Sequence, residues 1–296
     1  MMRLEVMARV VRSSLRVFVG CAAAAALLAV GAGQGSALRA TEAGPGNWTP
    51  FLHAVPSSDG TSIDVRLVAH SAVGPGVFAT MYQPGWPAPR TAAMTPLAAG
   101  SADDYAHTFT GLSPLVGMEG TLRITTTLSL AAPGKMAAAQ LLDTGPTSFE
   151  RAYVRAGEIT DVVSSDGGLV LHLSPNSFPA DAYIIVMPTC GLPAPLPVSW
   201  TAVGRPYVLR ASGAVLQTER PALLQLFFDP GLLGGADPNA LRILAWDPAA
   251  GTWEAGGTVN LRDYSVSQAV TRLTVYTLAA PRDIRRLHLP LLAKGC

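Results

Sequence analysis

The stretch LRITTTLSL, residues 122–130, alternates apolar and polar side chains. Leu122 and Ile124 fall on one side of an extended chain, and Arg123 and Thr125 fall on the other. A period of two residues is typical of a β-strand that has one face in a hydrophobic core and one face in solvent. The stretch therefore predicts a half-buried strand.

The same alternation recurs nearer the amino terminus. Ile63, Val65 and Leu67 share one face of a predicted strand, and Asp59-Gly60 just before them is a hairpin turn signal. Two other segments of this half depart from alternation and give different predictions. Residues 77–90 carry prolines and glycines and predict a loop or an edge strand, and residues 136–142 predict a helical turn.

The second half of the chain consists of short apolar runs separated by turn residues. Residues 183–187 form a continuous apolar run that Pro188 ends, and Asp166-Gly167-Gly168 marks a turn. Further strands are predicted at residues 207–210, 223–228, 241–246, 264–270 and 273–278. Strands at this spacing are typical of a β-sandwich. We therefore predict an all-β fold of two tandem β-sandwich domains after an amino-terminal signal peptide.

The composition agrees with this fold and excludes one class of function. The 296 residues include 29 glycines and 24 prolines, a density of turn-forming residues that suits many short strands. At about 150 residues per domain, the length predicts two domains. The formal net charge is +1, so no overall field attracts nucleic acid or an anionic membrane surface, and we expect no nucleic-acid partner.

The first forty residues have the organisation of a secretory signal. Arginines up to Arg16 precede an apolar run from Val17 to Val30, and small residues follow as far as Ala37. This order predicts a signal peptide that is cleaved after Ala37, and hence an exported protein located outside the cell or at its surface. The alternative is an uncleaved segment that anchors the protein in a membrane.

These patterns divide the chain into five segments. They are a signal peptide at residues 1–37, a flexible leader at residues 38–50, a β-sandwich similar to immunoglobulin or fibronectin type III domains at residues 51–147, a second β-sandwich module at residues 148–281, and a carboxy-terminal tail at residues 282–296. Whether Cys190 pairs with Cys296 is left open by their positions in the chain.

Two stretches of the second half carry a resemblance to a known type of module. The stretch GGLVLHLSPNSFPAD, residues 167–181, resembles the opening of ankyrin and netrin-receptor type β-sandwich modules. The stretch LRILAWDPAAGTW, residues 241–253, is similar to the closing segment of such modules in exported bacterial proteins. The resemblance covers residues 150–281 and implies an ectodomain module that supports or binds, without a catalytic residue.

No motif for a reaction is found in the sequence. Residues 111–115 approach the nucleophile elbow G-x-S-x-G of serine hydrolases but lack its second glycine. The histidines occur singly, not at the spacing of a zinc site. The adjacent carboxylates Asp103 and Asp104 are interpreted as part of a solvated turn. We therefore expect no catalytic residue, no metal and no cofactor.

Aromatic and histidine side chains give the one positive signal for ligand binding. Trp86 and Trp200 are candidates for a platform that stacks on a sugar or a peptide, since exposed aromatic rings bind flat ligands. His107 and His172 are assigned to the outward faces of their strands and are candidates for the same surface. The alternative is that the tryptophans pack in the cores and the histidines are simply solvated.

Export, tandem sandwiches and the missing catalytic motif predict a non-catalytic protein of the cell envelope or exterior, with a structural or adhesive role. The expected partner is a glycan or another envelope protein. A membrane is a partner only if the amino-terminal segment remains uncleaved. The alternative is an exported hydrolase with an unfamiliar active site.

Overall fold

The computed structural model describes residues 50–69, 73–98, 101, 103–114, 118–130, 138–144 and 146–282. In these residues the regular structure is β-strand except for two short 3₁₀ turns, η1 (Pro230–Leu232) and η2 (Pro238–Ala240). The predicted all-β fold class is therefore confirmed. The predicted signal peptide, nearly all of the leader and most of the tail lie outside the described residues. A helix long and apolar enough to span a membrane does not occur in the described part of the chain.

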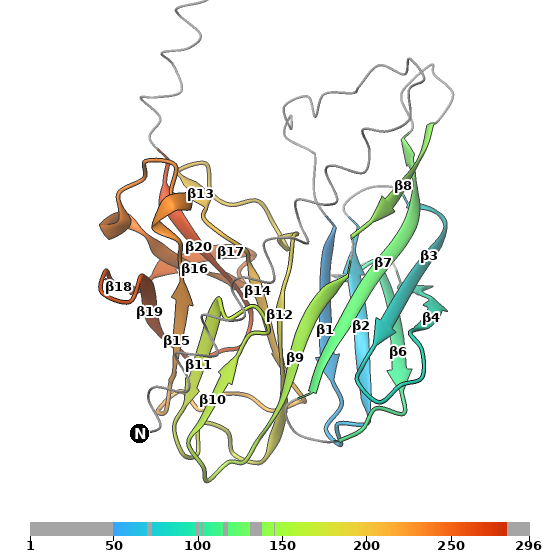
Figure 1. Ribbon diagram of the computed structural model, residues 1–296, viewed down its shortest axis with the longest axis horizontal. Coiled ribbons are helices and arrows are strands. Elements are labelled where there is room, and N and C mark those ends of the chain that lie inside the picture. The colour runs from blue at the N-terminus through green and yellow to red at the C-terminus, as the bar shows by residue number, and fades with distance from the viewer. Residues whose placement is uncertain are drawn as a thin grey trace, which may run out of the picture. The chain divides into compact units, whose positions relative to one another are not determined.

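The strands form three antiparallel sheets (Figure 1). Sheet A has the strand order β1-β2-β6-β5. Its strands are β1 (Phe51–Pro56), β2 (Ser62–Val68), β6 (Tyr105–Thr110) and β5 (Thr95–Pro96). The predicted Asp59-Gly60 turn connects β1 to β2. Gly60 has a φ of +68°, a backbone conformation that favours glycine because it has no Cβ.

Sheet C has five strands in the order β10-β11-β15-β19-β18. They are β10 (Thr160–Val163), β11 (Leu169–Leu173), β15 (Ala222–Phe227), β19 (Ser265–Val270) and β18 (Thr258–Asn260). The predicted turn at Asp166-Gly167-Gly168 connects β10 to β11. In β11 the buried residues Leu169 and Leu171 alternate with partly exposed ones, as a strand with one face in a core requires.

Sheet B is the largest, with the order β17-β16-β20-β14-β12-β9-β7-β3-β4, and β13 and β8 pair with β20 and β7. Its strands are β17 (Thr252–Gly256), β16 (Arg242–Asp247), β20 (Val275–Pro281), β14 (Tyr207–Ala211), β12 (Ala182–Pro188), β9 (Thr147–Val154), β7 (Met118–Leu130), β3 (Val73–Tyr82), β4 (Arg90–Ala93), β13 (Trp200–Ala202) and β8 (Ala138–Asp143). The strand predicted from the LRITTTLSL stretch is part of β7.

Sheets A and C pack against opposite faces of sheet B. In β12, Ile184 and Val186 belong to the core shared with sheet C, and Ile185 and Met187 belong to the core shared with sheet A. Figure 1 shows β9, β12 and β14 between the strands of sheet A and those of sheet C. Because both faces of β12 are covered, its sequence is a continuous apolar run instead of an alternating one.

Sheet B runs through both predicted domains. The predicted boundary after Thr147 falls within β9, which pairs with β7 on one side and with β12 on the other. The described residues, from 50 to 282, all belong to one compact unit. The division into two domains at this boundary stays a prediction.

One local prediction is wrong, and the prediction of a loop or edge strand at residues 77–90 is right for the loop at residues 83–89 but wrong for residues 77–82. The helical turn predicted at residues 136–142 is replaced by strand β8, which pairs with β7 over residues 138–143. Pairing with an existing strand satisfies the backbone of this segment and outweighs the helix propensity of its alanines. Residues 77–82 belong to β3, an interior strand between β7 and β4. The prolines and Gly85 of residues 77–90 begin only at Pro84, after β3 ends, so they remove no ladder hydrogen bond.

Candidate functional site

Trp86 is a packing residue in this structure. It is 8% exposed and belongs to the core between sheets A and B. With the Gln83 amide turned so that its oxygen faces the indole, Nε1 of Trp86 donates a hydrogen bond of 2.8 Å to that oxygen. The guanidinium carbon of Arg90 lies 3.8 Å from the ring centroid. Arg90 therefore occupies the ring face on which a ligand would stack.

The other three predicted binding residues lie on separate strands. Trp200 is half-buried on β13, opposite Pro281 of β20. His107 on β6 stands opposite the fully buried Val65 and packs edge-on against Phe109, with ring centroids 4.7 Å apart. Residues directly opposite in a ladder point to the same face, so His107 faces the core and its outward assignment is wrong. His107 is two residues before Phe109 on the strand, so both side chains lie on one face, and the sequence alone already indicates that His107 points inward.

His172 lies on the outward face of sheet C, as predicted. Its Nδ1 is 2.8 Å from Oδ1 of Asp161, and the imidazole is 38% exposed. With Trp86 between β3 and β4, Trp200 on β13 and His107 on β6, the four residues do not form one platform. A ligand-binding role for each of them stays a prediction.

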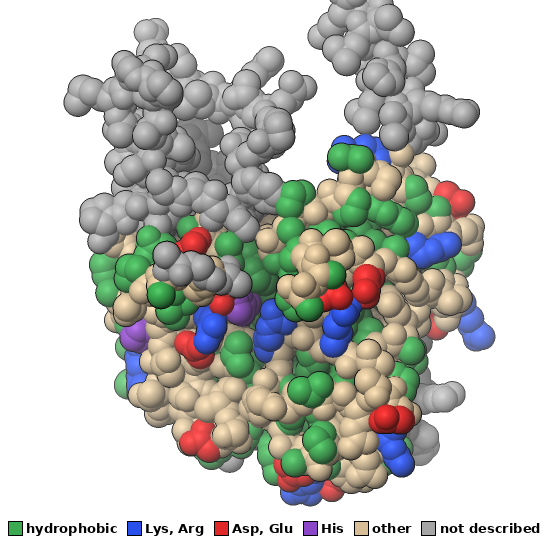
Figure 2. All heavy atoms as spheres, turned by 180° about the vertical axis from the view of Figure 1, so that it is seen from behind, with side chains coloured by type: hydrophobic (Ala, Val, Ile, Leu, Met, Phe, Trp, Pro, Cys, Tyr) green, Lys and Arg blue, Asp and Glu red, His purple; other side chains and the backbone are tan. Residues whose placement is uncertain are grey.

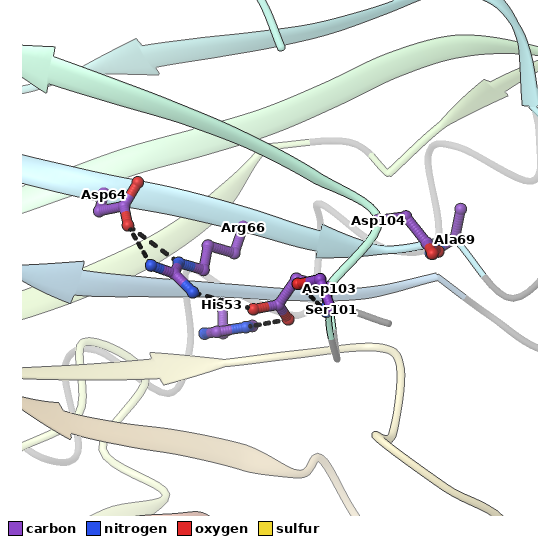
Figure 3. A network of polar contacts seen from close by, with 7 residues as sticks. All are labelled: His53, Asp64, Arg66, Ala69, Ser101, Asp103 and Asp104. Atoms are coloured by element: carbon purple, nitrogen blue, oxygen red, sulfur yellow. Dashed lines mark hydrogen bonds and ion pairs between the residues drawn. The ribbon is translucent and has the colours of Figure 1, made fainter. Parts of the chain in front are cut away.

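A buried polar network that sequence reasoning missed lies on sheet A (Figure 3). His53 of β1 and Arg66 of β2 stand opposite each other in the ladder, and both point toward Asp103, which precedes β6. Nε2 of His53 is 2.8 Å from Oδ1 of Asp103, and Nη1 of Arg66 is 3.3 Å from Oδ2. Arg66 also donates to Asp64, with a distance of 2.9 Å from Nε. Both carboxylate oxygens of Asp103 are therefore occupied.

The network fixes the charge states of its members. Burial is the largest influence on His53 and lowers its pKa below the ordinary 6.5; the hydrogen bond to Asp103 raises it without cancelling this, and Arg210 lowers it further. For Asp103 the largest single influence, burial, raises the pKa, but His53 and Arg66 together outweigh it and hold the pKa below its usual value. His53 is therefore neutral and donates through Nε2, and its Nδ1 carries a free lone pair.

Asp103 and Asp104 anchor the segment that precedes β6. The side chain of Asp104 accepts a 2.6 Å hydrogen bond from the backbone of Ala69, and the Asp104 amide donates to Leu67. Asp103 is 8% exposed. The interpretation of this pair as a solvated turn is therefore wrong for Asp103. Its partner His53 is fifty positions away in the sequence, so no local pattern announces the contact.

An imidazole that is held by a carboxylate is a proton acceptor, and the same arrangement occurs in catalytic and metal-binding histidines. In this network, however, His53 is 6% exposed and its Nδ1 makes no hydrogen bond. Among the described residues, no three His, Cys, Asp or Glu side chains gather as metal ligands would. Figure 2 shows one face of the molecule, with histidine, acidic and basic side chains together near its middle. The burial and the hydrogen bonds of the His53 network favour a role in holding the fold together.

A second feature is the face of sheet B that points away from sheet A along β3, β4 and β7, which we call the open face. Phe78, Thr80 and Tyr82 of β3 alternate with the buried residues Ala79 and Met81 and therefore lie on it. Phe78 is 43% exposed and Tyr82 is 36% exposed. Their neighbours in the ladder, on β7 and β4, are Thr121, Arg123, Thr125, Thr91 and Ala93.

Two carboxylates stand opposite each other beside the open face. Glu119 of β7 pairs in register with Glu150 of β9. Burial, and then the charge of Glu119, raise the pKa of Glu150 from 4.5 to about 7. Like charges directly opposite in a ladder are destabilising. The pair therefore favours a folded state in which Glu150 is protonated.

Glu150→Gln is expected to stabilise the protein at pH 8 and to give no gain at pH 4.5. The folded-state pKa of Glu150 is raised, so its favourable contribution is complete below 4.5 and is lost as the pH rises through about 7. Because the carboxyl is partly exposed, solvent screening reduces the expected gain at pH 8 to about 1 kcal/mol. Urea unfolding at both pH values measures it. A gain of equal size at both values would contradict the expectation.

Comparison with known protein families finds no match for this chain, and no curated protein matches it in sequence. The resemblance to ankyrin and netrin-receptor type modules therefore stays a prediction. The assignment of a function rests on the network, the open face and the chemistry of their side chains.

Proposed function

We propose that this chain is an exported, non-catalytic binding protein that holds a glycan on the open face of sheet B. The observation that carries the proposal is the pair of exposed aromatic rings, Phe78 and Tyr82, on an interior strand. Exposed aromatic rings on one face of a sheet provide stacking surfaces for a flat ligand. Export rests on the signal-like pattern of residues 1–37, with the protein then located outside the cell or at its surface.

The neighbours of the two rings favour a glycan over an apolar protein surface. Thr80 lies between Phe78 and Tyr82, and its Oγ1 is 2.8 Å from Oγ1 of Thr91. Arg123 stands opposite Thr80 on β7. Rings that alternate with hydroxyl and guanidinium groups match a sugar chain, which presents C–H faces for stacking and hydroxyls for hydrogen bonds. A protein partner would instead require a contiguous apolar patch.

The spacing of the rings favours a chain of sugars over a single sugar. Phe78 and Tyr82 are four residues apart on one strand, which corresponds to about 13 Å between their Cα atoms. A ligand that contacts both rings must therefore be extended along β3. On β7 the open face carries charges of both signs, in Arg123 and Glu119, so we propose a neutral polysaccharide.

The alternative, an exported hydrolase, has one specific observation in its favour. Glu119 and Glu150 stand opposite each other, and the raised pKa of Glu150 is a property of general acids in glycosidases. The His53 network offers less, since its imidazole is buried and its Nδ1 has no hydrogen-bond partner. A glycan that binds without being cleaved would support the binding proposal.

Phe78→Ala and Tyr82→Ala are each expected to weaken glycan binding about fivefold, because each removes one stacking contact worth about 1 kcal/mol. Isothermal titration calorimetry with soluble β-glucan, xylan and mannan measures the affinity. The matched control is Phe227→Ala, which removes a similarly exposed ring, 38% exposed, from sheet C. This control is expected to bind like the unmodified protein.

Three outcomes would count against the proposal. One is the absence of binding to all three polysaccharides, and another is unchanged affinity in both open-face variants. The third is release of reducing ends from a bound polysaccharide that Glu150→Gln abolishes. That result would assign the chain to the hydrolases and the carboxylate pair to its active site.

A further inference from the structure

The unpaired Nδ1 of His53 needs an explanation. It is a buried acceptor without a hydrogen-bond partner, and such groups are uncommon in folded proteins because each one costs free energy. Phe51 stacks on the same ring, with centroids 5.2 Å apart and an interplanar angle of 21°. An unused lone pair on Nδ1 is tolerable while the imidazole is neutral, whereas a buried N–H without an acceptor would cost free energy.

Among the described residues, the charged groups that act most strongly on His53 belong to three elements. Asp103, in the connection before β6, is the one anion bonded to it. Arg66 of β2 reaches the second oxygen of Asp103 and is also bonded to Asp64. Arg210 of β14, in sheet B, adds a second positive charge, and its guanidinium donates to the carbonyls of Leu209 and Leu273. His53 therefore lies where sheet A meets sheet B, with two cations and one bonded anion around it.

We propose that His53, Asp103 and Arg66 form an acid-sensitive latch, in which protonation of His53 releases the segment around Asp103 from the β1–β2 hairpin. The proposal is independent of glycan binding and concerns a different face of the molecule. It assigns the network a regulatory role that its hydrogen bonds alone do not imply.

Protonation changes the network in two ways. Nδ1 gains a hydrogen that has no acceptor, and a positive charge is added beside Arg66 and Arg210. Asp103 compensates only in part: its hydrogen bond and its negative charge raise the pKa of His53, but burial together with Arg210 and Arg66 outweighs them. The imidazolium regains hydration if the covering segment moves away.

The part that moves in this proposal is the connection around Asp103. It connects β5 to β6, and Ser101 within it is exposed. Besides the contacts of Asp103, its ties include the Asp104 amide to Leu67 at 2.9 Å, the Leu97 amide to Asp104 at 2.9 Å and the Ala69 amide to the Asp104 side chain. These hydrogen bonds are among those that opening has to break.

The direction of the pH dependence follows from the lowered pKa. The neutral form of His53 is favoured in the folded state, so the stabilisation is complete above pH 6.5 and is lost as the pH falls below it. Because one proton is taken up on opening, the equilibrium constant for opening rises up to about tenfold for each unit by which the pH falls. The loss continues until the pH reaches the folded-state pKa.

Hydrogen exchange of the full chain between pH 5 and pH 8, corrected for the intrinsic rate, tests the latch. Peptides that contain the amides of Leu97, Ala69 and Asp104 are expected to lose protection below pH 6.5 in the unmodified protein. His53→Gln keeps an N–H donor for Asp103 but does not titrate, so its protection is expected to be independent of pH. The matched control, His172→Gln, alters a His–Asp pair of the same 2.8 Å length that is exposed, and it is expected to behave like the unmodified protein.

Histidine NMR of the unmodified protein gives a second measurement that does not depend on how a variant folds. His53 is expected to be the neutral Nε2–H tautomer at pH 6.5 and to become protonated only at lower pH, together with the loss of protection. Equal protection at pH 5 and pH 8 would overturn the proposal, as would the same acid loss in His53→Gln. A His53 that titrates at or above pH 6.5 without local opening would also overturn it.

Discussion

Replacing Arg151 with Met is expected to lower the free energy of unfolding by about 2–6 kcal/mol, because two carbonyls each lose a donor at a cost of about 1–3 kcal/mol. Arg151, on β9, is 1% exposed and is among the largest fully buried side chains of the described residues. Its guanidinium donates to the carbonyls of Gly60 and Ser113 and lies near the ring of Tyr183. A Met side chain of similar length donates no hydrogen bond, so both carbonyls lose a charged donor. Urea denaturation measures the loss.

The control for this variant is Arg155→Met. Arg155 is exposed, and its ion pair with Glu158 is of the kind that contributes less than about 1 kcal/mol. Arg151→Lys keeps the charge but has a single donor group. Its free energy of unfolding is therefore expected to lie between those of Arg151→Met and the unmodified protein. If Arg151→Met were as stable as Arg155→Met, the guanidinium would not tie sheet A to sheet B.

The contact at Gly60 shows why this region tolerates few changes. A Cβ added to Gly60 would lie 2.3 Å from the ring of Tyr183. Tyr183 is itself 8% exposed, and its hydroxyl donates a 3.2 Å hydrogen bond to the carbonyl of Pro114. The turn signal at Asp59-Gly60 predicts the hairpin, but the close approach of Tyr183 depends on residues more than a hundred positions away.

Much of the fold could be predicted from local patterns because strands with one buried face carry a period of two. Leu122 and Ile124 are 1% and 0% exposed, on the face that the alternation assigns to the core. The continuous run in β12 marks a strand, but it does not say which two sheets cover its faces. The pairing of β9 with both β7 and β12 joins the halves of the chain, and strand pairing of this kind leaves no signal in a single strand.

The candidate sites could not be predicted, for a different reason. His53, Arg66 and Asp103 are singly unremarkable in the sequence and become a network because β1 and β2 pair and the connection before β6 folds over them. Phe78 lay in a segment interpreted as a loop or edge strand, so its exposure on an interior strand was not expected. Aromatic content alone pointed to tryptophans, of which Trp86 is buried.

Truncating either of two neighbouring residues of β12 is expected to lower the midpoint temperature of a single unfolding transition that both cores share. Ile184 and Ile185 are both 0% exposed, and they point into the cores shared with sheet C and with sheet A. Replacement of a buried Ile by Ala costs about 2–5 kcal/mol. Because one backbone carries both side chains, between β9 and β14, loss of either core removes support from the other. Differential scanning calorimetry of Ile184→Ala and Ile185→Ala tests this.

The control is Ile159→Ala, which removes an isoleucine that is 78% exposed and is expected to leave the transition nearly unchanged. Two separate transitions would be the contrary result, provided that Ile184→Ala lowers one and Ile185→Ala lowers the other. In that case the core shared with sheet A and the core shared with sheet C would unfold independently, although β12 contributes side chains to both. The predicted boundary at residue 147 would then separate two thermodynamic domains, even though sheet B passes through both.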